Sequence, residues 1–104
     1  MMAPGEMRDW AEPLVPGFRA VEYGNIAALE SAISGRTAAV VLEPLRTDYD
    51  GRAPNPDYLP AVRRLCDEHG ARLIIDEVVT GMGRLGKLWG IQHSGVSQIG
   101  RAHV

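Results

Sequence analysis

The chain has 104 residues, enough for one small domain or for a piece of a larger one. Its net charge of −2, with acidic and basic residues interspersed, gives no support to binding of nucleic acid or of a membrane surface. No apolar run approaches the roughly 20 residues that span a bilayer, and the start lacks a signal-peptide pattern, so we expect a cytoplasmic protein. The single cysteine, Cys66, excludes an internal disulfide, and Cys66, His69 and His93 lack metal-ligand spacing.

The first third of the chain predicts one strand and one helix after an irregular start. Residues 1–17 are rich in Pro, Gly and Met and show no period, so we predict an irregular N-terminal segment. Residues 18–23 alternate apolar and polar side chains, which predicts a half-buried strand. Asn25 is the expected N-cap of a helix, with Gly35 as its C-terminal stop. The apolar face of this helix consists of Ile26, Leu29 and Ile33.

The middle of the chain predicts two buried strands. Residues 38–42 are a continuous apolar run of strand length that ends at Glu43. Residues 73–75 are a second such run, too short for a buried helix and rich in β-branched side chains, and it ends at Asp76. With a helix between them, residues 38–76 predict one βαβ unit with parallel strands.

The connecting helix is predicted over residues 57–69. Asp57 is the expected N-cap and Gly70 the stop, and Pro60 falls in the first turn, where its missing N–H costs nothing. An apolar face is formed by Leu59, Val62, Leu65 and Cys66. After the second strand, residues 88–93 are compatible with a short helix or an irregular packed segment.

Both predicted buried strands end in an acid, and this makes the carboxyl edge of the sheet the expected ligand site. In open α/β sheets, ligands bind outside the carboxyl ends of the strands. The long polar loop over residues 45–56 follows the first of these acids, and long loops in compact domains are often functional. Asp76 is therefore the first candidate site residue.

One interpretation of Asp76 is the second acidic motif of P-loop ATPases, where an Asp helps to hold Mg²⁺. The glycine turn from Gly81 to Lys87 matches most of the G-x-x-x-x-G-K-[ST] pattern. Leu88, however, occupies the position of the metal-binding hydroxyl, and the glycine turn follows the acidic strand directly. Both features disfavour a nucleotide loop.

A second interpretation is that Asp76 pairs with a pyridine nitrogen. Pyridoxal phosphate works as an electron sink only while its ring nitrogen is protonated, and a nearby carboxylate raises the pKa of that nitrogen. If the strand continues, Val78 would point the same way as Asp76 and pack on the ring face.

The sequence resembles the class III (omega) aminotransferases, which are fold type I pyridoxal phosphate enzymes. Their signature is similar to residues 73–89 (LIIDEVVTGMGRLGKLW), their preceding strand to residues 38–44 (AAVVLEP), and their intervening helix to residues 58–70 (YLPAVRRLCDEHG). Residues 13–18 (PLVPGF) resemble the ornithine, acetylornithine and 4-aminobutyrate branch. The resemblance implies an α/β fold, a partial parallel-sheet large domain over residues 18–97.

The resemblance also implies which residues bind the cofactor. The Asp that pairs with the pyridine nitrogen falls on Asp76, the ring-packing Val on Val78, and the Glu that lies close to the site on Glu43. Two positions depart from the family pattern. Val79 stands where a Gln near the cofactor's phenolic oxygen is usual, and Asp48 stands where many members have the Glu that pairs with a substrate-gating Arg.

The resemblance implies transfer of an amino group from an amine or amino acid to a 2-oxo acid by a homodimer. The one lysine, Lys87, is not at the family's Schiff-base position, so we expect this segment to be inactive alone and assign it no catalytic residue. The alternative is a non-catalytic binding module that keeps the fold. Residues 99–104 match the translation of a common sequencing adapter, so we expect 98–104 to be an artefactual tail.

Overall fold

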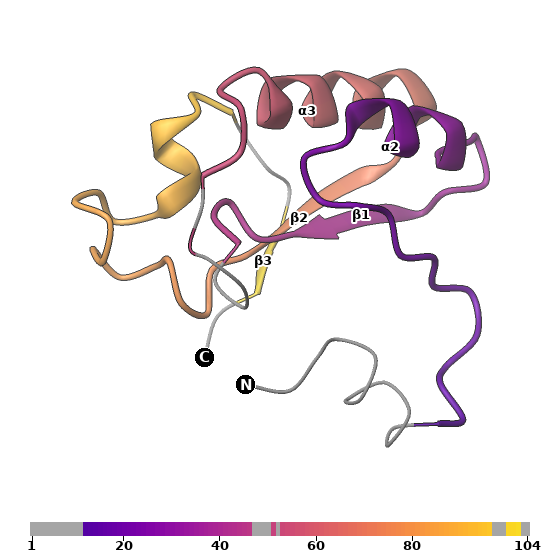
Figure 1. Ribbon diagram of the computed structural model, residues 1–104, viewed down its shortest axis with the longest axis horizontal. Coiled ribbons are helices and arrows are strands. Elements are labelled where there is room, and N and C mark those ends of the chain that lie inside the picture. The colour runs from indigo at the N-terminus through magenta and orange to yellow at the C-terminus, as the bar shows by residue number, and fades with distance from the viewer. Residues whose placement is uncertain (1–11, 47–50, 52, 97–99, 103–104) are drawn as a thin grey trace.

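A computed structural model of the chain describes residues 12–46, 51, 53–96 and 100–102. These ranges form a small α/β arrangement in which two helices lie beside a three-stranded sheet (Figure 1). The elements are α2 (Ile26–Ala32), β1 (Ala39–Leu42), α3 (Tyr58–His69), β2 (Arg72–Asp76), the 3₁₀ helix η1 (Gly90–His93) and β3 (Gly100–Ala102). None of the helices in these ranges has the length and apolar character that a membrane crossing requires.

The predicted βαβ unit is confirmed. The sheet has the order β1-β2-β3, and β1 pairs with β2 in parallel, with Leu42 opposite Ile75. Parallel neighbours need a crossover, and α3 provides it. As a result, β1 and β2 end at the same edge of the sheet.

Within the described ranges, the helices cover one face of this sheet, because α2 and α3 both lie on the same side of it (Figure 1). The core forms on that side, where Leu73 and Ile75 of β2 are fully buried. On the other face Val41 is 55% exposed, so the prediction that residues 38–42 are buried throughout is wrong. A parallel strand is buried on both faces only when helices cover both. The core side chains are Leu29, Ile33, Tyr58, Leu59, Val62, Leu65, Cys66, Ala71, Leu73, Ile75 and Ile91.

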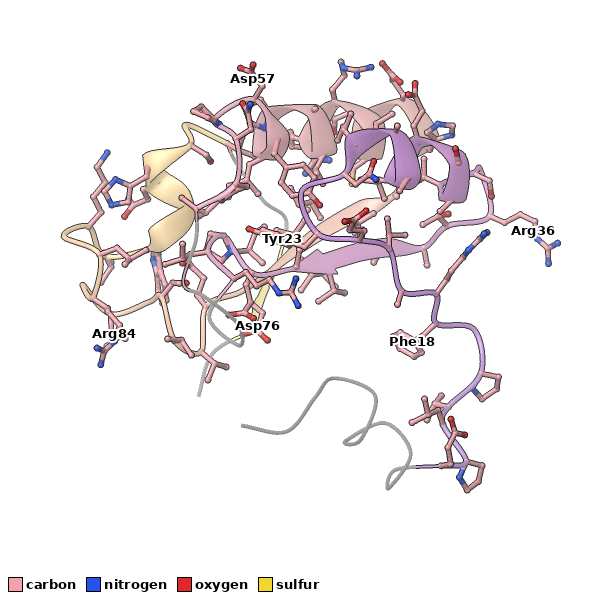
Figure 2. The ribbon with its side chains drawn as sticks, viewed as in Figure 1. Phe18, Tyr23, Arg36, Asp57, Asp76 and Arg84 are labelled. Carbon is pink, nitrogen blue, oxygen red and sulfur yellow. The ribbon has the colours of Figure 1, made fainter. Side chains whose placement is uncertain are left out.

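The strand predicted over residues 18–23 does not form. β1 is an edge strand of the described sheet, and residues 18–23 form no hydrogen-bonded ladder with its open edge. The alternation still has a physical consequence, because Val21 and Tyr23 pack against the core. Phe18, in contrast, is 83% exposed and extends away from the sheet (Figure 2).

The start of α2 is as predicted, but its end is not. The Asn25 side chain accepts a hydrogen bond from the backbone N–H of Ala28 at 3.0 Å, as an N-cap should. The helix stops at Ala32, and Ile33 is its C-cap in an extended conformation. Gly35 is therefore not the stop. A polar turn ends the helix instead: Thr37 donates its backbone N–H to the Ser34 carbonyl, and Ser34 donates its own N–H to the Thr37 hydroxyl.

The bounds and apolar face of α3 agree with the predicted helix, and the expected apolar side chains are all buried. Asp57 occupies the N-cap position, but its side chain makes no capping hydrogen bond. Asn55 closes the turn instead, since its side chain accepts from the Asp57 N–H at 3.1 Å. Gly70 ends the helix with a φ of +69°, and its N–H reaches the carbonyls of the last turn.

At the far edge of the sheet, β3 pairs in parallel with β2, and Ala102 lies opposite Asp76. This pairing places part of the segment that we expect to be an artefactual tail beside the candidate site. It does not test where that segment comes from, so the division of the chain into residues 1–17, 18–97 and 98–104 stays a prediction.

We predict that Gly70→Ala destabilises the fold by about 1 kcal/mol, because an L side chain is strained in the left-handed conformation that ends α3. Gly35→Ala is the matched control, since its added Cβ meets no atom within 4 Å and its φ is not positive. Chemical denaturation of both variants measures the difference. Equal unfolding free energies would contradict the cap assignment.

Candidate functional site

Asp76 is the last residue of β2 and lies at the carboxyl edge of the sheet (Figure 2). Side chains of a strand alternate between its faces, so the half-buried Asp76 lies on the open face while its neighbour Ile75 lies in the core. One carboxylate oxygen, Oδ1, accepts a hydrogen bond from the backbone N–H of Val78 at 3.0 Å. That bond restricts the orientation of the carboxylate, and among the described residues Oδ2 is left for another partner.

Val78 does not continue the strand, so the assumption behind its predicted orientation is wrong. The chain turns directly after Glu77, because Asp76 takes the Val78 N–H and the Glu77 carbonyl accepts from the Gly81 N–H at 3.0 Å. The Val78 side chain is 55% exposed beside the end of β2. Its role as a ring-packing residue stays a prediction.

Glu43 follows the last residue of β1, and the strand register places it level with Asp76. It is half-buried, and its backbone carbonyl accepts a hydrogen bond from the Tyr23 hydroxyl at 2.9 Å. A shallow pocket at this point is lined by Val21, Glu22, Tyr23, Glu43 and Arg46. The fold thus brings the two predicted acids to one edge. Asp48 lies outside the described residues.

Tyr23 anchors the end of β1 to the rest of the core. Its ring meets the ring of Tyr58 edge to face, with centroids 5.3 Å apart. Burial raises the pKa of the Tyr23 phenol, and the nearby Tyr58 and Glu43 raise it further, whereas Arg46 opposes this shift. The sequence indicated Tyr23 only as part of a strand, so its contact with Glu43 was not predicted.

Glu77 also lies at this edge, and its burial and contacts were not predicted from the sequence. Its side chain is only 1% exposed, on the same face as Leu73 and Ile75. Its Oε1 accepts hydrogen bonds from the Thr80 hydroxyl at 2.8 Å and from the Gly90 N–H at 2.5 Å. Extending the alternation of β2 by one step would have placed residue 77 on the buried face, and this was the available signal.

The glycine turn does not have the arrangement of a nucleotide loop. It leaves the end of β2, and the element that follows it, η1, is a single 3₁₀ turn of four residues. A phosphate-binding loop instead opens onto the N-terminus of a full helix. The Lys87 ammonium donates to the Gln92 carbonyl of η1 at 3.4 Å.

Comparison with known families decides between the ATPase and the aminotransferase interpretations of the chain, whereas the role of Asp76 stays a prediction. The family model described as aminotransferase class III matches residues 11–98, most of the chain. The chain belongs to the class III aminotransferases. Membership confirms the resemblance seen in the sequence and overturns the ATPase interpretation.

Similar proteins include ornithine and acetylornithine aminotransferases. The acetylornithine aminotransferase of Methanopyrus kandleri is 47% identical over 91 residues, which are 88% of this chain and 23% of that protein. The ornithine aminotransferase structure from Toxoplasma gondii has a TM-score of 0.79 at 34% identity, over 85% of this chain and 21% of that one. The N-acetylornithine aminotransferase structure from Stenotrophomonas maltophilia K279a has a TM-score of 0.77 at 36% identity, over 82% of this chain and 24% of that one.

The fold expectation is thereby confirmed, because these α/β aminotransferase structures superpose on most of the chain. The chain spans about a quarter of the length of each of these class III relatives. It therefore corresponds to one part of such a protein, the part that carries β1, α3, β2 and the glycine turn.

We predict that Tyr23→Phe lowers the free energy of unfolding at neutral pH by about 1 kcal/mol, because the hydrogen bond to Glu43 is lost. The variant should also change how steeply the free energy of unfolding falls at alkaline pH. A phenol whose pKa is raised by folding stabilises the folded state below the ordinary tyrosine value of about 10, and this contribution is lost as the pH rises above that value. Denaturation from pH 8 to 11 should show a steeper decline for the wild type. Parallel curves would contradict this account.

Proposed function

We propose that this chain is the part of a pyridoxal phosphate-dependent aminotransferase that holds the pyridine side of the cofactor. The observation that carries the proposal is the arrangement of Asp76. It ends a parallel strand, one of its oxygens is held by the Val78 N–H, and the other is left for a partner at the open edge. Membership of the class III family supports the same assignment.

The described residues fit this cofactor. A pyridinium nitrogen needs one oriented carboxylate at hydrogen-bond distance, and Asp76 offers an oxygen whose partner oxygen is already fixed. A half-buried carboxylate is also screened less by water than an exposed one, which strengthens the pairing. The exposed apolar side chain of Val78, at the turn beside it, can cover a ring face.

The chemistry supplied by the bound cofactor is that of an electron sink for the substrate's amino carbon. The residues of this chain hold and polarise that group. Asp76 keeps the proton on the ring nitrogen, and Val78 limits water at the ring face. Glu43, level with Asp76 on β1, adds a second negative charge at the same edge.

We further propose that the remaining machinery comes from the rest of the longer protein. Lys87 of the glycine turn binds the Gln92 carbonyl of η1, and it stands at a position that the family does not use for its cofactor-binding lysine. The segment alone should therefore not catalyse transamination. Its transferred group would pass between a small amine or amino acid and a 2-oxo acid, in a homodimer, as the resemblance implies. We place this protein in the cytoplasm as part of the same proposal.

We predict that Asp76→Asn in the longer protein lowers turnover by at least about 100-fold, because an amide still accepts the Val78 N–H but carries no charge for the ring nitrogen. Asp76→Ala should be at least as damaging. Asp67→Asn on the exposed face of α3 is the matched control. Steady-state kinetics with pyridoxal phosphate present measures the effect, and turnover near the wild-type value would refute the role of Asp76.

We predict that Val79→Gln leaves the dissociation constant for pyridoxal phosphate unchanged or lowers it. The Val79 side chain is 44% exposed, so a longer amide has room to reach the cofactor's phenolic oxygen. Leu88→Gln, at a comparably exposed apolar position of the glycine turn, is the control and should change nothing. Equilibrium dialysis provides the measurement. A marked loss of affinity in Val79→Gln alone would show that this position faces the cofactor differently.

A further inference from the structure

We infer that Glu77 is a positioning residue that fixes the orientation of Asp76 through the turn between them. This inference rests on the function proposed above. Glu77 is almost completely buried, yet the proposed chemistry gives it no task. Burying a carboxylate is expensive unless hydrogen bonds compensate for the lost water. Its contacts therefore indicate what it does.

Glu77 holds the glycine turn at three points. Its carboxylate oxygen Oε1 accepts from the Thr80 hydroxyl at 2.8 Å and from the Gly90 N–H at 2.5 Å. Its backbone carbonyl accepts from the Gly81 N–H at 3.0 Å. One residue thus joins the end of β2 to the near side of the turn, at Thr80 and Gly81, and to its far side, at the start of η1.

When Glu77 holds the turn in this position, the Val78 N–H is directed at the Asp76 carboxylate. Val78 lies between Glu77 and Thr80, the two residues joined by the buried carboxylate–hydroxyl bond. Its N–H is the donor that holds Asp76 Oδ1 at 3.0 Å. Loss of the Glu77 contacts would free the turn, and with it the donor that sets the direction of the Asp76 carboxylate.

Close packing shows how little freedom this arrangement has. A Cβ built on Gly90 would lie 2.7 Å from Glu77 Oε1 and 3.0 Å from the Thr80 Cβ. A Cβ built on Gly81 would lie 2.8 Å from the Glu77 carbonyl oxygen and 2.9 Å from the Trp89 ring. Both glycines are needed for close approach to Glu77, so a side chain at either position must displace the carboxylate or the turn.

Glu77 acts at a distance from the cofactor. It lies on the covered face of the sheet with Leu73 and Ile75, whereas Asp76 lies on the open face. Its second oxygen, Oε2, is buried and has no hydrogen-bond partner among the described residues. The carboxylate is therefore directed into the fold, and its influence on the ring nitrogen passes through Val78 and Asp76.

The test uses the longer protein that contains this segment, loaded with pyridoxal phosphate. We measure the dissociation constant of the cofactor, the pH midpoint of its absorbance, and amide hydrogen exchange at Val78 and Gly90. We expect Glu77→Ala to raise the dissociation constant roughly tenfold or more, because small misplacements of site groups are costly. The pH midpoint should move in the same direction as in Asp76→Asn, by a smaller amount, and exchange at both amides should accelerate.

Three further variants separate positioning from loss of structure. Glu77→Gln keeps an acceptor oxygen for the Thr80 hydroxyl and the Gly90 N–H, so its cofactor spectrum should match that of the wild type. Gly90→Ala should reproduce the Glu77→Ala shift, whereas Gly35→Ala, whose Cβ meets nothing within 4 Å, should not. Thr80→Val removes one hydrogen-bond donor to Glu77 with little change in side-chain volume, and it should shift the pH midpoint less than Glu77→Ala does. It also provides the test if Glu77→Ala does not fold. Glu68→Ala on the surface of α3 is the matched control and should resemble the wild type.

The two hypotheses fail in different ways. If wild-type protein shows no saturable cofactor binding, or if Asp76→Asn leaves the pH midpoint unchanged, the proposed function is wrong. If those results are as expected but folded Glu77→Ala, Gly90→Ala and Thr80→Val keep the wild-type dissociation constant and pH midpoint, the positioning role of Glu77 is overturned. A general loss of stability lowers the unfolding temperature without moving the spectrum of the folded protein.

Discussion

The parallel pairing of β1 and β2 is the constraint on which the rest of this structure depends. Two parallel neighbours need a crossover, and α3 both makes that crossover and covers the sheet with an apolar face. Because the paired strands run in the same direction, they end at one edge. The register places Glu43 and Asp76 level at that edge even though 32 residues separate them in the sequence. A site built on a strand edge gains its rigidity from the core behind it.

Two consecutive acids at this edge have opposite surroundings. Asp76 lies on the open face with one oxygen fixed and one oxygen available, which suits a group that meets a ligand. Glu77 lies on the covered face, where it accepts hydrogen bonds from the turn that follows. The period-two geometry of a strand separates their surroundings. These two consecutive residues therefore connect the face of the sheet that is proposed to meet a ligand with the packed interior on the other face.

Local signals predicted the parts of the fold whose causes are local. The N-cap at Asn25, the left-handed stop at Gly70 and the apolar face of α3 all follow from rules that act within a few residues. The strand predicted over residues 18–23 needed a hydrogen-bonded neighbour, and the segment does not pair with the described sheet. The exposure of Val41 needed knowledge of which face the helices cover. Asp57 occupies the N-cap position without a side-chain capping bond, and its own N–H donates to the Asn55 side chain two residues earlier.

The family, the strand-helix-strand order over residues 38–76 and the candidate acids Glu43 and Asp76 could be read from the sequence alone, because strand length, helix period and the glycine signature lie in neighbouring residues. Three contacts became visible only in the folded chain: Asp76 accepts the Val78 N–H, Tyr23 donates to the Glu43 carbonyl, and Glu77 is buried against Gly90. These contacts depend on where the chain turns after β2 and on which segments pack together. Those outcomes follow from the sum of many distant contacts, which no short stretch of sequence contains.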